Sequence, residues 1–214
     1  MKILGMLKLG LILALFAVIS CVMLAFVYTG TSAIIAQRQQ ADLGEALREL
    51  FPETRFFIVI DDITSPDSFV TIENAFVAVN GKPDNIPIGV VLTVSRASYS
   101  GPIKTMVGVN TGGFITGIKI MEHSDTPGLG ANAASPSYFV DRTNGITFYG
   151  QFTGKKASDP FEVKNDIAVI TASTVTSVAV SSSVKAAALA AIAWLEGRNT
   201  ITSITEKNSE RETE

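Results

Sequence analysis

A run of hydroxyl side chains near the C-terminal end is the first candidate for chemistry. Residues 171–177 read Thr-Ala-Ser-Thr-Val-Thr-Ser and precede an Ala/Val-rich segment with helical spacing. Hydroxyls at a helix start usually cap it, because their oxygens accept hydrogen bonds from the free N–H groups of the first turn. The same position suits a phosphate, since those N–H groups and the helix dipole attract anions. The physics of this hydroxyl run (171–177) favours a simple cap and leaves phosphate binding open.

A second candidate is the glycine loop (126–130), which reads Thr-Pro-Gly-Leu-Gly. Pro127 fixes its own φ, whereas Gly128 and Gly130 permit positive φ and let the backbone approach a flat ligand closely. Leu129 would then offer an apolar contact from the tip of the loop. The alternative is an ordinary turn whose leucine packs into the core, and spacing alone favours that turn.

The composition excludes several other kinds of site. The net charge of −3 gives no basic patch for nucleic acid. Cys21 is the one cysteine and His123 the one histidine. Because Cys21 falls in an apolar stretch, the rest of the chain has no thiol for a disulfide, a zinc site or an iron–sulfur cluster. We therefore expect no metal site, and any redox chemistry needs an organic carrier.

The elements that must position these residues begin with an apolar N-terminal stretch. Residues 9–36 contain no charge, and residues 9–28 are almost continuously apolar. About 20 such residues span a hydrocarbon core of roughly 30 Å as a helix. Lys2 and Lys8 precede the stretch, which favours a cytoplasmic N-terminus and a body on the opposite side. The alternative is a cleaved signal peptide, although the apolar core is longer than is usual for one.

The rest of the chain predicts one α+β domain with an antiparallel sheet and a closing C-terminal helix. Leu43, Ala46, Leu47 and Leu50 share one face of a connecting helix that Pro52 ends. The expected strands are 56–60, 69–72, 76–79, 89–95, 103–109 and 114–121. We expect 69–72 and 76–79 to form a hairpin or a bulged pair, with a turn at Asn80-Gly81.

Two details of this prediction concern side-chain direction and helix length. In the strand 114–121, Ile115, Gly117, Lys119 and Met121 would share one face, with Ile118 and Ile120 on the other. The closing helix covers 177–195, and Gly197 is its expected stop. The predicted segments are a cytoplasmic start at 1–8, a membrane helix at 9–30, a connecting helix at 31–55, the domain at 56–197 and a polar, frayed tail at 198–214.

Three stretches together carry a family resemblance. They are Tyr-Ser-Gly-Pro-Ile at 99–103, a hairpin strand running into the glycine loop at 117–130, and Ile-Thr-Ala-Ser-Thr-Val-Thr-Ser-Val-Ala-Val at 170–180. In order and spacing the chain resembles the extracytoplasmic FMN-binding domain of the G subunits of Rnf complexes. It is similar also to the related C subunits of sodium-translocating NADH:quinone reductases. The chain length and compact domain favour the G subunits.

The resemblance implies FMN attached through a phosphoester bond to threonine, in a motif of the form Asp-x-x-Ser/Thr-Gly-Ala-Ser/Thr whose last residue is the acceptor. Carried over, the motif places the acceptor at Thr174, with Thr176 as a second choice. Ala172 stands where glycine is usual and Ser173 where alanine is usual. The acidic position falls on Ala168, with Asp166 two residues earlier as a substitute.

The resemblance also implies the remaining site residues. Thr171, Ser173, Thr176 and Ser177 would surround the attachment point, and Glu122, His123, Thr126, Leu129 and Gly130 would lie near the isoalloxazine ring. For His123, a solvent-facing or hydrogen-bonded loop residue is an equal alternative.

The implied function is an electron relay in a cytoplasmic (inner) membrane, with no catalytic residue of its own. Its implied partners are the A, B, C, D and E subunits of an Rnf-type ferredoxin:NAD oxidoreductase, and a flavin transferase that delivers FMN from FAD. The main alternative is an anchored structural subunit that has lost its flavin, and membership of the related C subunits is kept beside it. A regulatory or nitrous-oxide-related relative fits less well, because such proteins usually carry further spans and cysteine clusters.

Overall fold

The computed structural model describes residues 2–81 and 86–211 and divides the chain into two compact units. These units are Met1–Glu45 and Ala46–Glu214, and each is described by itself. The packed unit begins earlier than the expected residue 56. The reason is that Ala46, Leu47 and Leu50, the apolar face predicted for the connecting helix, are buried in it.

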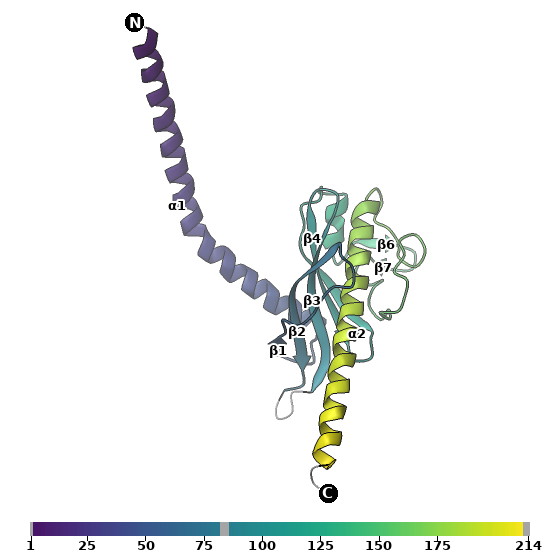
Figure 1. The fold of residues 1–214 in the computed structure, drawn as a ribbon. Coiled ribbons are helices and arrows are strands. Elements are labelled where there is room, and N and C mark those ends of the chain that lie inside the picture. Colours follow the sequence, from purple (N-terminus) through teal and green to yellow (C-terminus); the bar gives the residue numbers. More distant parts are fainter. Residues whose placement is uncertain (1, 82–85, 212–214) are drawn as a thin grey trace. The chain divides into compact units, whose positions relative to one another are not determined.

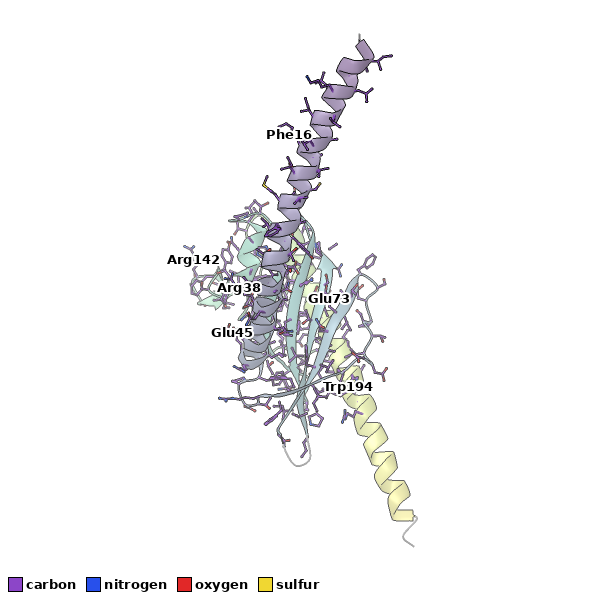
Figure 2. The ribbon with its side chains drawn as sticks, turned by 90° about the vertical axis from the view of Figure 1, so that its left-hand side faces the viewer. Phe16, Arg38, Glu45, Glu73, Arg142 and Trp194 are labelled. Atoms are coloured by element: carbon purple, nitrogen blue, oxygen red, sulfur yellow. The ribbon has the colours of Figure 1, made fainter. Side chains whose placement is uncertain are left out.

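The first unit is helical. The expected membrane helix and connecting helix are one uninterrupted helix, α1 (Lys2–Leu50). Its apolar side chains, Phe16 among them, radiate into open space (Figure 2). Residues Gly5–Leu50 contain an 18-residue window with a mean hydropathy of 2.8, none of it buried. A helix that is apolar all round and this long has the length and composition of a membrane span.

The second unit is built on a five-stranded antiparallel sheet in which each strand pairs with the next along the chain (Figure 1). The strands are β1 (Phe56–Val59), β2 (Val70–Val79), β3 (Pro87–Ala97), β4 (Pro102–Asn110) and β5 (Ile115–Glu122). After the sheet come η1 (Gly130–Ala134), a small hairpin of β6 (Phe139–Asp141) and β7 (Ile146–Thr147), and finally α2 (Thr174–Arg211). The predicted α+β class with a closing helix is confirmed.

One face of the sheet packs against α2. Val90, Leu92 and Val94 alternate along β3 and share a core with Val180 and Val184 of α2. This alternation places every second strand residue on the helix side. α2 also has the length and composition of a membrane span, but 61% of its apolar window is buried, as expected for a core helix. The helix therefore closes the domain.

Three details of the predicted elements are wrong. α2 does not stop at Gly197 but continues to Arg211; Gly197 lacks the positive φ that a C-terminal cap needs. The segments 69–72 and 76–79 are one strand, β2, with a register shift between Ile72 and Asn74. Ile115 lies in the core beside Ile118 and Ile120, because a second register shift in the β4–β5 pairing reverses the alternation.

The other face of the sheet has a niche floored by glycines. Leu50 and Phe51, at the end of α1, sit over Gly89, Gly108 and Gly117. A Cβ at Gly89 would lie 2.3 Å from the Phe51 ring and 2.5 Å from the Val109 carbonyl oxygen. The glycines therefore make room for Leu50 and Phe51, so both faces of the sheet are covered at this point.

A tyrosine hydroxyl closes the outer edge of β5. The Ile120 N–H donates to the Tyr149 hydroxyl at 2.8 Å, and that hydroxyl donates to the Ala134 carbonyl at 3.3 Å. Burial raises the pKa of Tyr149 to about 12. The neutral phenol therefore joins an edge strand to η1, next to the glycine loop.

We expect Tyr149→Phe to lower the free energy of unfolding by about 1–2 kcal/mol, because the part-buried Ile120 N–H loses its partner. Urea unfolding of the full chain in detergent, followed by circular dichroism, measures the change. Tyr138→Phe is the control, since the structure records no hydrogen bond that its hydroxyl makes with a described residue. Equal stability of the two variants would contradict the role of Tyr149.

Candidate functional site

A cavity of about 520 Å³ lies where the glycine loop meets the start of α2. Its walls come from segments far apart in the sequence: the loop between β3 and β4, the segment after β5, and the first turn of α2. The lining residues are Tyr99, Asp125, Thr126, Leu129, Gly130, Ala172, Ser173, Thr174, Val175 and Thr176. The volume is within the range of small-molecule sites, about 300–1,000 Å³. The two sequence motifs therefore form one site.

The loop before α2 is held closed by a serine. The Ser177 hydroxyl accepts from the Ile170 N–H at 3.0 Å and donates to the Ser173 carbonyl at 2.9 Å. The Ser177 N–H also donates to that carbonyl, which makes Ser173 the N-cap residue of α2. Ser173 and Ser177 are both buried. Ser177 thus shapes the loop without lining the cavity.

The two candidate acceptor threonines differ in accessibility. Thr174 is the first residue of α2 and is exposed at the cavity. Thr176 is only 1% exposed, and its hydroxyl donates to Asp125 at 2.7 Å. The Thr174 hydroxyl therefore faces the cavity with no hydrogen-bond partner among the described residues, whereas the Thr176 hydroxyl is buried and bonded to Asp125.

Asp125 is a functional candidate that the sequence analysis missed. Its buried carboxylate accepts from the Ser98 hydroxyl at 2.9 Å, the Ser100 N–H at 3.0 Å and the Thr176 hydroxyl. Burial by itself raises the pKa of Asp125, but the hydrogen bonds from Thr176, Ser100 and Ser98 outweigh it and hold the pKa below its usual range. Asp125 therefore joins the walls of the cavity as an ionised group. Only its place directly before the glycine loop hinted at this role.

The glycine loop needs both of its glycines. Gly128 has a φ of +81°, which disfavours other residues. A Cβ at Gly130 would lie 2.7 Å from Asp125 and from the Thr176 hydroxyl, so only glycine lets the loop pack there. Leu129 between them is 43% exposed and lines the cavity. The alternative in which Leu129 packs into the core is therefore wrong.

Tyr99 and Val175 are further lining residues that the sequence analysis did not select. Tyr99 is 77% exposed and Val175 53% exposed, although both are apolar enough for a core. With Leu129 they give the cavity an apolar rim. The place of Tyr99 in the Tyr-Ser-Gly-Pro-Ile stretch could have indicated a site residue, but nothing in the sequence predicted that its side chain is exposed.

Ala172, at the usual glycine position of the motif, has a φ of +58°. This left-handed conformation costs an L-residue with a Cβ roughly 1–2 kcal/mol. We expect Ala172→Gly to raise the free energy of unfolding by about 1 kcal/mol, because relief of this strain exceeds the extra entropy of glycine in the unfolded chain. Thermal unfolding of parent and variant checks this, and Ala168→Gly, at a residue without positive φ, serves as the control. A variant less stable than its parent would contradict the strain.

Four of the predicted site residues do not line the cavity: Thr171, Ser177, Glu122 and His123. Glu122 pairs with Lys104 on the sheet at 2.8 Å. His123 is partly buried, and its Nδ1 has no hydrogen-bond partner among the described residues. Thr126, Leu129, Gly130, Ser173, Thr174 and Thr176, by contrast, are brought together there.

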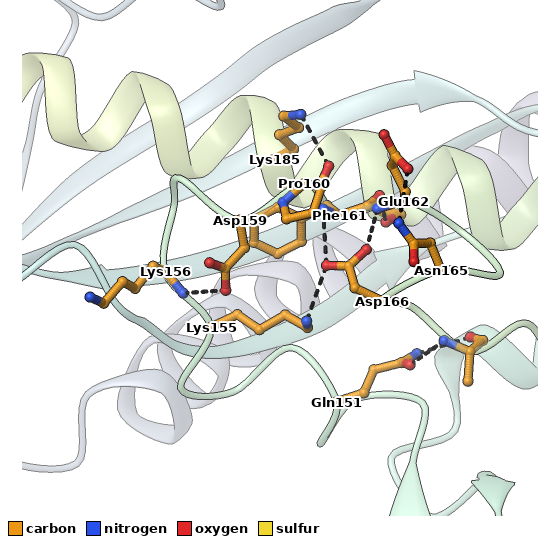
Figure 3. Close-up of polar contacts among 12 residues, drawn as sticks. Gln151, Lys155, Lys156, Asp159, Pro160, Phe161, Glu162, Asn165, Asp166 and Lys185 are labelled. Carbon is orange, nitrogen blue, oxygen red and sulfur yellow. Dashed lines mark hydrogen bonds and ion pairs between the residues drawn. The ribbon is translucent and has the colours of Figure 1, made fainter.

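Asp166, the proposed substitute for the acidic motif residue, is used elsewhere. Its carboxylate pairs with Lys155 at 3.1 Å and accepts from the Phe161 and Glu162 N–H groups (Figure 3). Gln151 fixes the backbone of Ala168 through two hydrogen bonds. Asp166 therefore folds the segment before the hydroxyl run and does not line the cavity.

Comparison with known families agrees with the fold and the cavity. The family described as the FMN-binding domain matches residues 98–189, and the RnfG N-terminal region matches residues 1–50. The first match contains every residue that lines the cavity, and the second ends with α1. The chain therefore belongs to the class of membrane-anchored proteins with an FMN-binding domain.

Similar proteins narrow this class. The chain is 32% identical to the G subunit of an ion-translocating oxidoreductase complex of Shewanella piezotolerans, covering 67% of this chain and 70% of the relative. It is 30% identical to the G subunit of the Na⁺-translocating ferredoxin:NAD⁺ oxidoreductase complex of Acetobacterium woodii, covering 83% and 87%. A proton-translocating counterpart from Clostridium ljungdahlii is 32% identical, covering 79% and 82%. The chain belongs to the family of G subunits of ion-translocating oxidoreductase (Rnf) complexes.

Proposed function

We propose that this protein relays electrons through one FMN that is covalently attached to Thr174 by a phosphoester bond. The observation that carries the proposal is the contrast within the hydroxyl run. Thr174 is exposed at the cavity, at the N-terminus of α2, whereas Thr176 and Ser177 are buried and hydrogen-bonded. Free N–H groups of the first helical turn stabilise a phosphate at that position.

The cavity fits the flavin that the family implies. Tyr99, Leu129 and Val175 offer apolar contacts to a flat ring, and the close approach at Gly130 lets the loop backbone form one wall. Bound FMN supplies transfer of one or two electrons, and the protein positions it and sets its potential. Thr174 holds the phosphate end in this arrangement, and the glycine loop keeps bulkier side chains away from the ring.

We also propose that α1 is a single membrane span with a cytoplasmic N-terminus. Lys2 and Lys8 on one side of the apolar stretch support this orientation. The FMN-binding domain then lies on the extracytoplasmic side and exchanges electrons with the other subunits of the complex, A to E. A flavin transferase is the proposed maturation partner, because the phosphoester bond needs an enzyme that delivers FMN from FAD. One of the relatives is named as Na⁺-translocating and another as proton-translocating, so an electron relay of this kind is compatible with either ion.

A second candidate is an anchored protein of the same complex without covalent flavin. Two observations favour it: the strained Ala172 in the motif, and Ala168 at the acidic position while Asp166 is paired with Lys155. These residues belong to the segment that the transferase must recognise.

Fluorescence of the denatured protein separates the two candidates. The full chain is expressed with a flavin transferase, denatured, run on a gel and viewed under ultraviolet light. Trypsin then releases the peptide 165–185, and its fragmentation locates the added mass. We expect fluorescence and FMN on Thr174. A full-length band without fluorescence would support the protein that lacks covalent flavin.

A further inference from the structure

The lining of the cavity contains one negatively charged side chain, that of Asp125. Among the residues that line the cavity in the described part of the chain, no other has a charged side chain. Neither lysine nor arginine forms an ion pair with Asp125 among the described residues, whereas Asp67 and Asp166 both have such partners. The carboxylate is stabilised mainly by hydroxyl and backbone donors from Ser98, Ser100 and Thr176. The nearby His123 adds a smaller electrostatic attraction.

Burial makes this charge effective over distance. Asp125 is 6% exposed, so water and salt screen it less than a surface carboxylate. Its donors come from the β3–β4 loop and from α2, and Gly130 packs against it. The carboxylate therefore has a fixed position in the wall of the cavity, and a ligand in that cavity experiences its field.

We propose that the Asp125 carboxylate sets the reduction potential of the flavin and lowers it. This inference rests on the proposed attachment of FMN at Thr174, since the ring must lie in the same cavity. Two electrons and one proton convert the neutral oxidised ring into the reduced anion, so reduction adds one negative charge. A fixed anion in the wall repels that charge and stabilises the oxidised form. Asp125 thus makes the bound flavin a stronger reductant.

The test removes the negative charge of Asp125 while keeping a side chain of nearly the same shape. Asp125→Asn and the control Asp141→Asn each remove one negative charge from the full chain. Asp141 is the last residue of β6, outside the cavity lining, where its carboxylate accepts hydrogen bonds from Thr143 and Asn144. Both variants are expressed with the transferase, purified in detergent and titrated with dithionite while flavin absorbance is recorded. Fluorescence of the denatured band reports attachment independently.

We expect Asp125→Asn to raise the ratio of reduced to oxidised flavin at a fixed potential about tenfold, which is a midpoint shift of ~30 mV to more positive values for a two-electron couple. Asp141→Asn should leave the midpoint at the parent value. Equal midpoints for Asp125→Asn, Asp141→Asn and the parent, with flavin attached in all three, would overturn the proposal. Absence of fluorescence from the parent itself would instead refute covalent attachment.

A second pair of variants covers the case in which Asp125→Asn does not fold. Thr126→Asp adds an anion at an exposed lining residue, and Thr153→Asp adds one at an exposed residue outside the lining. Neither side chain belongs to the buried network of Asp125. We expect Thr126→Asp alone to shift the midpoint to more negative values. An unchanged midpoint would show that a carboxylate in this wall does not affect the flavin, and the proposal would fail.

Discussion

Thr174→Val is expected to abolish covalent flavin completely and to leave the fold intact. Valine has nearly the shape of threonine but no hydroxyl, so no phosphoester bond can form. Because Thr174 is exposed, the free energy of unfolding should change by less than about 0.5 kcal/mol. Gel fluorescence of the denatured full chain measures attachment, and circular dichroism checks the fold.

Two further variants make this result specific to the hydroxyl of Thr174. Thr174→Ser keeps a hydroxyl and should retain fluorescence. Thr153→Val removes the hydroxyl of an exposed threonine outside the cavity lining and should match the parent. Fluorescence that survives in Thr174→Val would move the acceptor to another residue, and the peptide 165–185 would identify it if it is in the hydroxyl run.

Gly89→Ala is expected to lower the free energy of unfolding by about 3 kcal/mol. The new Cβ would lie 2.3 Å from the Phe51 ring and 2.5 Å from the Val109 carbonyl oxygen. Phe51 is buried and cannot swing away freely, and Val109 belongs to the neighbouring strand β4, so its backbone is fixed by the β3–β4 pairing. The end of α1 must therefore lift from the sheet, or the strands must separate.

Thermal unfolding of the full chain in detergent measures this loss, with an expected fall in Tm of about 10 °C. Gly197→Ala is the matched control, because a Cβ there has no neighbour within 4 Å and alanine favours a helix interior. The control should be as stable as the parent or more so. If Gly89→Ala melted at the same temperature as Gly197→Ala, the glycine niche would have no role in stability.

Much of the fold could be predicted from local sequence patterns. The apolar N-terminal helix, the strands between Phe56 and Glu122 and the helical face of Val180 and Val184 all have periodicities that one segment reveals by itself. The errors occur where a local pattern is interrupted. Ile115 changes face because of a register shift, and Gly197 is carried inside α2 rather than ending it.

The residues of the candidate site also divide into those that local sequence patterns predicted and those that they did not. Thr174, Leu129 and Gly130 were predicted because they belong to continuous motifs, and they do lie around one cavity. Asp125 was missed because its role depends on Ser98 and Thr176, residues remote from it in the sequence. Glu122 and His123 were selected as neighbours of the glycine loop, yet neither lines the cavity.

The sequence by itself determined the apolar helix and the α+β class, and it predicted the hydroxyl run as the place for an attachment. Periodicity and motif spacing are properties of neighbouring residues, so they can be read without coordinates. Only the tertiary structure decided which exposed hydroxyl of the run lines the cavity. The packing of Gly130 against Asp125 buries Thr176, while the closed loop at Ser177 leaves Thr174 exposed. The φ of +58° at Ala172 likewise follows from closing that loop, because a backbone angle is set by the contacts on both sides of it.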